Sequence, residues 1–117
     1  MAKRSVALAA FRGEEFLAAQ LDSILRQSLP PDEIVLCDDS PDDATRQAVA
    51  PLLAAHPEIR YIRNPVPLGP DRNFEQAISM TTGDLIFLAD QDDVWLPGRM
   101  AALAARLPDP DAIAGAF

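Results

Sequence analysis

Cysteine and histidine are scarce in this chain. Its 117 residues include one cysteine, Cys37, and one histidine, His56. A single thiol excludes a disulfide framework within the chain, and it cannot supply the thiolates of a structural zinc site. Cys37 lies within an apolar run, where a cysteine behaves as a small hydrophobic side chain. This cysteine usage is typical of a protein from a reducing compartment.

Long hydrophobic runs are also missing, although apolar residues make up 49% of the sequence. No run approaches the roughly 20 residues that a helix needs to cross a membrane. Near the start of the chain, Lys3 and Arg4 precede a short apolar stretch at residues 6–11, and acidic residues follow soon after it. This pattern does not match a secretory signal peptide.

Basic residues are outnumbered by acidic ones. The chain has 10 lysines and arginines against 18 aspartates and glutamates, which gives a net charge of −8. A nucleic-acid partner requires a basic face, so this charge balance argues against one. An acidic protein can still bind a phosphate-bearing ligand where a metal ion or an arginine supplies local positive charge.

Two hydrophobic patterns alternate along the chain. Short apolar runs predict buried strands at residues 5–10, 33–37, 59–63 and 84–89, with a last strand beginning in residues 111–117. Apolar residues at helical spacing predict helices at residues 14–27, 40–55, 72–81 and 97–107. This alternation predicts a single α/β domain over residues 1–117, with a mostly parallel sheet between two layers of helices. Because the sequence stops within a predicted strand, we expect it to be the front part of a longer, truncated fold.

The second predicted helix carries two local signals. Ser40 is a favourable N-cap residue, and Pro41 suits the first helical position. Further along, Pro51 lacks the backbone donor that a helix interior uses, so we expect it to break or kink this helix.

Acidic side chains cluster after two of the predicted strands. Asp38 and Asp39 follow the second strand, and Asp90, Asp92 and Asp93 follow the fourth. In an open α/β sheet, ligands bind beyond the carboxyl ends of the strands, which share one edge. Carboxylates gathered there repel one another unless a divalent cation binds, and oxygen ligands favour Mg²⁺ or Mn²⁺ over zinc. We expect phosphates of a substrate to complete the coordination of such an ion.

Several motifs stand in the same order as in a known enzyme family. They are the opening strand "SVALAAF", the helix with "LDSIL", the strand and turn "EIVLCDDS", and the segment "GDLIFLADQDDVW". With these motifs, essentially the whole chain resembles the start of the family 2 glycosyltransferases, a large inverting group. The stretches "DQDDVW" and "RNFEQA" are similar to bacterial rhamnosyltransferase-like members. The resemblance implies a three-layer α/β/α, Rossmann-like GT-A fold of the nucleotide-diphospho-sugar transferases.

The resemblance assigns the acidic cluster to metal binding. Asp90 and Asp92 match the D-x-D motif of the family. Asp90 would contact the ribose or the metal, and Asp92 would bind the metal that holds the diphosphate, either Mn²⁺ or Mg²⁺. Asp93 would support the site or help to place the acceptor.

The resemblance also implies a nucleotide-sugar site. Asp39, with Asp38 beside it, would accept a hydrogen bond from the imide N–H of a uracil or thymine ring. Guanine shares such a donor, and cytosine lacks it. Ala9 and Phe11 would line the base pocket, and Arg72 would face the nucleotide or its phosphates.

The implied reaction is sugar transfer with inversion, from a UDP- or dTDP-sugar to a glycan or lipid-linked acceptor. The metal would stabilise the departing diphosphate, and a carboxylate base from beyond Phe117 would deprotonate the acceptor. We therefore expect this chain to hold the donor half, to bind nucleotide weakly and to be inactive by itself. A nucleotide-sugar donor would place the protein in the cytoplasm, either free or peripheral to the inner membrane.

Alternative interpretations exist for each signal. The acidic cluster could be a solvated turn at the start of the next helix, Arg72 a surface residue, and Phe11 and Trp95 ordinary core. The whole chain could be a non-catalytic nucleotide-binding or interaction module derived from the same fold. A phosphate-accepting receiver domain is disfavoured, because such domains need a lysine near their end and Lys3 is the only lysine here.

Overall fold

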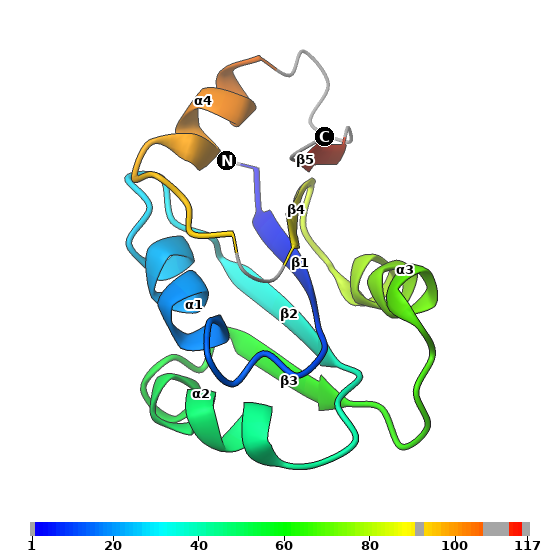
Figure 1. Cartoon of the computed structure of the whole chain (residues 1–117). Coiled ribbons are helices and arrows are strands. Elements are labelled where there is room, and N and C mark those ends of the chain that lie inside the picture. Colours follow the sequence, from blue (N-terminus) through cyan, green and yellow to red (C-terminus); the bar gives the residue numbers. More distant parts are fainter. Residues whose placement is uncertain (1, 91–92, 107–112, 116–117) are drawn as a thin grey trace.

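The computed structural model describes residues 2–90, 93–106 and 113–115, the last of these by their backbone (Figure 1). The strands are β1 (Arg4–Ala10), β2 (Glu33–Asp38), β3 (Ile59–Arg63), β4 (Leu85–Asp90) and β5 (Ile113–Gly115). The helices are α1 (Leu17–Leu25), α2 (Ala44–Ala55), α3 (Pro70–Met80) and α4 (Arg99–Ala105). None of these helices, within the part of the chain that is described, has the length and apolar character that a membrane crossing requires.

The strands form one sheet in the order β3-β2-β1-β4-β5. Every pairing among the described strands is parallel, with β1 at the centre between β2 and β4. In this register Ala9 lies beside both Cys37 of β2 and Asp90 of β4. The predicted parallel α/β sheet is confirmed, and the strand ends that carry the acidic residues meet at one edge.

Helices cover both faces of the sheet (Figure 1). On one face, apolar side chains of α1, α2 and α4 pack on the strands in a cluster that includes Leu21, Val49 and Met100. On the other face, α3 packs through Ala77 on a smaller cluster that includes Cys37. The result is the predicted arrangement of three layers, in which alternate strand residues enter opposite clusters.

Several predicted helix boundaries are wrong. The first helix begins at Leu17 rather than at Glu14, because the N–H groups of Phe16 and Leu17 turn back to the carbonyl of Gly13. The third begins with Pro70, a residue whose fixed φ suits the first helical position.

The second helix corrects two further predictions. Helix α2 begins at Ala44, so Ser40 is not its N-cap; its hydroxyl group instead donates to the carboxylate of Asp38 at 2.6 Å. The helix also continues through Pro51 to Ala55, so Pro51 does not break it. Packing of the apolar face of α2 on the core outweighs the missing backbone donor of Pro51.

Candidate functional site

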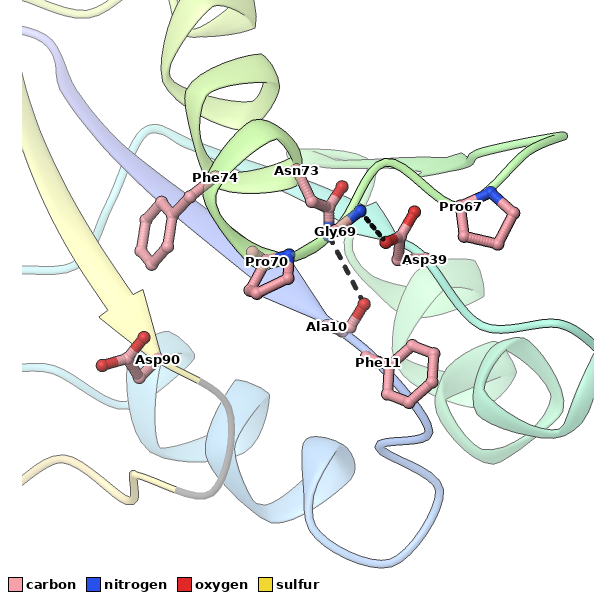
Figure 2. A pocket seen from close by; sticks show the side chains of 10 residues that line it. Ala10, Phe11, Asp39, Pro67, Gly69, Pro70, Asn73, Phe74 and Asp90 are labelled. Atoms are coloured by element: carbon pink, nitrogen blue, oxygen red, sulfur yellow. Dashed lines mark hydrogen bonds between the residues drawn. The ribbon is translucent and has the colours of Figure 1, made fainter.

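A cavity of about 540 Å³ opens at the carboxyl edge of the sheet. Its walls come from the ends of β1, β2 and β4, the loop after β3 and the first turn of α3. The lining residues are Ala9, Ala10, Phe11, Asp39, Pro67, Gly69, Pro70, Asn73, Phe74 and Asp90 (Figure 2). Four of the residues that the sequence singled out are therefore brought together here, namely Ala9, Phe11, Asp39 and Asp90. This is the edge at which an open parallel sheet is expected to bind its ligand.

Asp39 is buried at the wall of the cavity, with 4% of its surface exposed. Its Oδ1 accepts hydrogen bonds from the side chain of Asn64 at 2.9 Å and from the backbone N–H of Leu68 at 2.8 Å. Its Oδ2 accepts one from the backbone N–H of Gly69 at 2.9 Å. Burial by itself would raise the pKa of Asp39, but these three donors outweigh it and hold the pKa below its ordinary value. The group is therefore an ionised carboxylate whose partners are all neutral.

The loop after β3 supplies two of these donors because of its glycine and prolines. Gly69 has a φ of +87°, which a residue with a Cβ rarely adopts. This conformation turns the chain so that the consecutive N–H groups of Leu68 and Gly69 reach the two oxygens of Asp39. Pro70 follows at once and starts α3.

Asn64 and Asn73 belong to the site, and the sequence analysis missed both. Asn64 directly follows β3, just as Asp39 directly follows β2. The rule that ligands bind beyond the carboxyl ends of the strands could therefore have identified Asn64. Asn73 lies four residues before Ala77, on the apolar side of α3, and a buried amide at such a position is a signal in itself. The side chain of Asn73 donates to the backbone carbonyl of Cys37 at 3.0 Å. It also donates to the backbone carbonyl of Ala10 at 3.4 Å (Figure 2).

Asp38 points away from the cavity and is not among its lining residues. Its Oδ1 accepts hydrogen bonds from the backbone N–H and the hydroxyl group of Ser40, at 3.0 and 2.6 Å. Its Oδ2 accepts one from the hydroxyl group of Tyr61 at 2.5 Å. The two neighbouring aspartates are thus used differently, Asp38 within the protein and Asp39 at the cavity.

Ala9 and Phe11, which the resemblance assigns to a base pocket, lie at the end of β1 and line the cavity. Phe11 is 47% exposed, so it is not an ordinary core residue. The guanidinium group of Arg12 lies 5.3 Å from the centre of its ring. Figure 2 shows the Phe11 ring beyond the end of β1, and Asp90 lies at the end of the neighbouring strand. An aromatic ring beside a cavity offers a surface on which a planar base can stack.

Arg72 is exposed and does not line the cavity. The next residue along α3, Asn73, faces the sheet instead, because successive helix residues differ in direction by about 100°. A contact between Arg72 and a nucleotide stays a prediction.

Asp90 ends β4 with an exposed side chain at the cavity. Its carboxylate accepts no hydrogen bond from the described residues, while Gln20 of α1 donates to its backbone carbonyl. Asp92 lies outside the described residues, and Asp93 is exposed. Within residues 2–90 and 93–106, no three side chains of metal-binding type come together. The carboxylate of Asp90 offers the hard oxygen ligand that Mg²⁺ and Mn²⁺ prefer, and Asp92 stays the predicted second ligand.

Trp95 is 4% exposed and belongs to the core beneath α1 and α4. Its backbone N–H donates to the hydroxyl group of Ser23, and the guanidinium group of Arg99 lies over its ring. The core interpretation of this residue is therefore correct. Cys37 is fully buried in the sheet, and burial raises the pKa of its thiol to about 11, which makes a nucleophilic role untenable at neutral pH.

Sequence comparison places this arrangement among known proteins. A family model described as "Glycosyl transferase family 2" matches residues 5–117. The protein named "Putative glycosyltransferase EpsE" from Bacillus subtilis (strain 168) is 35% identical over 107 residues, which are 90% of this chain and 38% of that protein. A GalNAc(5)-diNAcBac-PP-undecaprenol beta-1,3-glucosyltransferase from Campylobacter jejuni is 29% identical over 107 residues, which are 91% of this chain and 35% of that protein. The chain thus spans little more than a third of the length of these relatives.

Structural comparison gives the same fold. The mannosyltransferase PcManGT from Pyrobaculum calidifontis, in complex with GDP-Man and Mn²⁺, superposes with a TM-score of 0.83 at 24% identity. That match covers 93% of this chain and 33% of the mannosyltransferase. S. aureus TarS 1–349, in complex with UDP-GlcNAc, superposes with a TM-score of 0.76 at 24% identity over 88% of this chain and 30% of that TarS chain.

Proposed function

Because this chain belongs to glycosyl transferase family 2, we propose that it forms the nucleotide-sugar-binding part of a metal-dependent, inverting glycosyltransferase. The observation that carries the proposal is the carboxylate of Asp39, which is buried, ionised and directed at a cavity at the carboxyl edge of the sheet. Relatives and structural neighbours that act on or bind nucleotide sugars support it.

The base of the nucleotide binds to Asp39. A carboxylate can accept about four hydrogen bonds, and the protein supplies two to Oδ1 and one to Oδ2. The remaining acceptor position on Oδ2 suits the ring N–H of uracil, thymine or guanine, and a cytosine ring has no such donor. Phe11 supplies a stacking surface at the mouth of the cavity, and Ala9 lines its wall. Among these bases we propose uracil or thymine, hence a UDP- or dTDP-sugar.

Asp90 and Asp92 would hold a divalent cation, Mn²⁺ or Mg²⁺, near the end of β4, and Arg72 would add positive charge for the diphosphate. When bound, such an ion stabilises negative charge on the departing nucleoside diphosphate. The mannosyltransferase neighbour, whose complex contains Mn²⁺ together with its nucleotide sugar, supports this assignment.

The transferred sugar is a hexosyl group, with a rhamnosyl group as one candidate, and the acceptor is a glycan or a lipid-linked glycan. The lipid-linked alternative is supported by relatives whose names specify diphosphoundecaprenol or PP-undecaprenol acceptors. The acceptor site and the catalytic base lie outside the described residues in this proposal, so the chain by itself binds donor without turnover. Such an enzyme works in the cytoplasm, at the inner face of the membrane if its acceptor is lipid-linked.

Calorimetric titration of the chain with UDP, dTDP, GDP and CDP, each with and without Mn²⁺, tests the proposal. We expect UDP or dTDP to bind only with Mn²⁺, and CDP to bind more weakly under the same conditions. Equal binding of all four nucleotides would contradict the role of Asp39. Absence of any binding with Mn²⁺ would instead favour a non-catalytic module that retains the fold.

A further inference from the structure

Three buried side chains form a continuous hydrogen-bonded chain at the wall of the cavity. Asp39 directly follows β2, Asn64 directly follows β3, and Asn73 lies in the first turn of α3. Their exposed fractions are 4%, 6% and 2%. The amide group of Asn64 donates to Asp39 Oδ1 at 2.9 Å and to Asn73 Oδ1 at 2.8 Å. This relay, defined here as Asp39, Asn64 and Asn73, ties together three segments that are separate in sequence.

The direction of every bond in the relay is set by the backbone. The amide nitrogen of Asn73 faces the carbonyl oxygens of Cys37 and Ala10, and carbonyl oxygens can only accept. Its Oδ1 must therefore face Asn64, which can satisfy it only by donating. The second hydrogen of the same Asn64 amide nitrogen is then directed at Asp39. No member of the relay can reverse without leaving a buried donor or acceptor unpaired.

We propose that Asn64 and Asn73 are positioning residues that keep Asp39 an acceptor only, and that they thereby set the preference of the site for a base with a ring N–H. This inference rests on the proposed function. A protonated Asp39 would offer an O–H donor to the unprotonated ring nitrogen of cytosine. The relay opposes that state, because protonation would place a proton among three donors that already point at the carboxylate.

Neutral hydrogen-bond donors, rather than a positively charged side chain, keep Asp39 ionised. Burial raises the pKa of Asp39. Hydrogen bonds from Asn64, Leu68 and Gly69 lower the same pKa by more, so the net shift is downward. Two of these donors are backbone groups, so Asn64 is the side chain among them that mutation can remove. Asn73 acts one step further away, because it holds the amide of Asn64 in the donating orientation.

Titration of Asn73→Ala and Asn64→Ala with UDP and CDP, both in Mn²⁺, tests the role in base selection. We expect the ratio of UDP affinity to CDP affinity to fall roughly tenfold, the effect of one hydrogen bond to a charged group. Val49→Ala, which creates a cavity in the core under α2, controls for lost stability and should keep the native ratio. A parallel loss of UDP and CDP affinity in Asn73→Ala would overturn the proposal.

A second measurement needs no nucleotide. The carboxyl carbon of Asp39, followed by NMR during an acid titration, should show a higher midpoint in both variants than in the native chain and in Val49→Ala. The other acids of this edge, Asp38, Asp90, Asp92 and Asp93, are the same in all four proteins, so the difference reports the relay. An unchanged midpoint alongside normal UDP binding would overturn only the positioning role. A native chain that binds neither nucleotide would overturn the proposed function and, with it, the role in base selection.

Discussion

Two buried carboxylates lie at opposite ends of the second strand, and the protein treats them differently. Glu33 begins β2 and Asp39 directly follows it. They are 7% and 4% exposed, and hydrogen bonding holds the pKa of each below its ordinary value in spite of burial. Glu33 is paired with the guanidinium group of Arg60 at 3.3 Å. Asp39 has neutral donors and a cavity in front of it.

The surroundings of Glu33 are those of a structural contact. Its carboxylate accepts hydrogen bonds from the hydroxyl group of Ser5 and the backbone N–H of Thr82, both at 2.8 Å, in addition to the arginine. Nearby, a Cβ at Gly83 would lie 2.3 Å from Ser5 Oγ and 2.8 Å from the backbone carbonyl oxygen of Lys3, so this end of the sheet is closely packed. The comparison teaches that burial and a lowered pKa do not identify a ligand site by themselves. A site also needs an unused acceptor position and space in front of it.

The largest expected effect is on nucleotide binding at the carboxyl edge of the sheet, where the cavity lies. Asp90→Asn and Asp92→Asn should each abolish Mn²⁺-dependent nucleotide binding, because a neutral amide is a poor ligand for a hard divalent cation. The side chain of Asp90 is exposed and has no hydrogen-bond partner among the described residues, so Asp90→Asn should leave the melting temperature unchanged. Calorimetry with UDP and Mn²⁺, together with thermal unfolding, measures both quantities. If Asp92→Asn bound nucleotide with Mn²⁺ as the native chain does, its predicted metal role would be wrong.

Asp39→Asn should have the next largest effect. Removing the charge and half of the acceptor capacity should weaken UDP binding about a hundredfold, the upper range for a hydrogen bond to a charged group. The variant should also lose stability, because an amide N–H would then face a backbone N–H at Gly69. UDP titration at a temperature well below the unfolding transition separates the two effects. Native affinity in Asp39→Asn would show that the base does not bind to this carboxylate.

Glu33→Gln is the matched change at the other end of β2. It should reduce stability and leave UDP affinity unchanged. The variant should lose about 1 to 3 kcal/mol of unfolding free energy, because a buried charge-assisted contact is replaced by an amide whose N–H groups face Arg60. Urea denaturation measures this loss. UDP affinity should be native, since the Glu33 contacts lie at the opposite edge from the cavity. Weakened UDP binding in a folded Glu33→Gln variant would contradict the division between the two ends.

The alternation of apolar runs predicted the parallel three-layer fold, because each strand is short and apolar and each helix repeats at a regular period. The rule that ligands bind at carboxyl ends then predicted which loops meet, and Asp39 and Asp90 do line one cavity. Boundaries were less predictable. Ser40 has the chemistry of an N-cap, yet its hydroxyl group bonds to Asp38, a competition that only the folded geometry decides.

The sequence could not predict that Asp38 would bond within the protein while Asp39 lines the cavity. Adjacent residues at the end of a strand point in opposite directions, but which of the two faces the cavity depends on where Tyr61 and Asn64 lie, and both come from another strand and its exit. Asn73 was missed for a related reason. Its importance comes from contacts with Ala10 and Cys37, more than thirty residues away in sequence.

The smallest expected effect is on stability in acid, and it again distinguishes Glu33 from Asp39. Burial would raise the pKa of Glu33, but the donors Thr82 and Ser5 and the cation Arg60 lower it on balance. Near pH 4 the unfolded chain, with glutamate pKa values of about 4.3, then binds more protons than the folded chain does. The contribution of Glu33 to stability is therefore complete above that value and is lost as the pH falls through the lower pKa of the folded state.

Glu33→Gln lacks this titration, so its unfolding free energy should fall less steeply than that of the native chain between about pH 4.5 and 3. Asp39→Asn should flatten the same profile, because the pKa of Asp39 is also lowered in the folded state. Saturating UDP with Mn²⁺ should steepen the acid loss more in Glu33→Gln, where an ionised Asp39 would still bind the base, than in Asp39→Asn, where only the metal ligands would titrate. Urea denaturation across this pH range, with and without nucleotide, measures the difference. If nucleotide changed the acid dependence of the unfolding free energy equally in the two variants, Asp39 would have a structural role like that of Glu33 and would not bind the base.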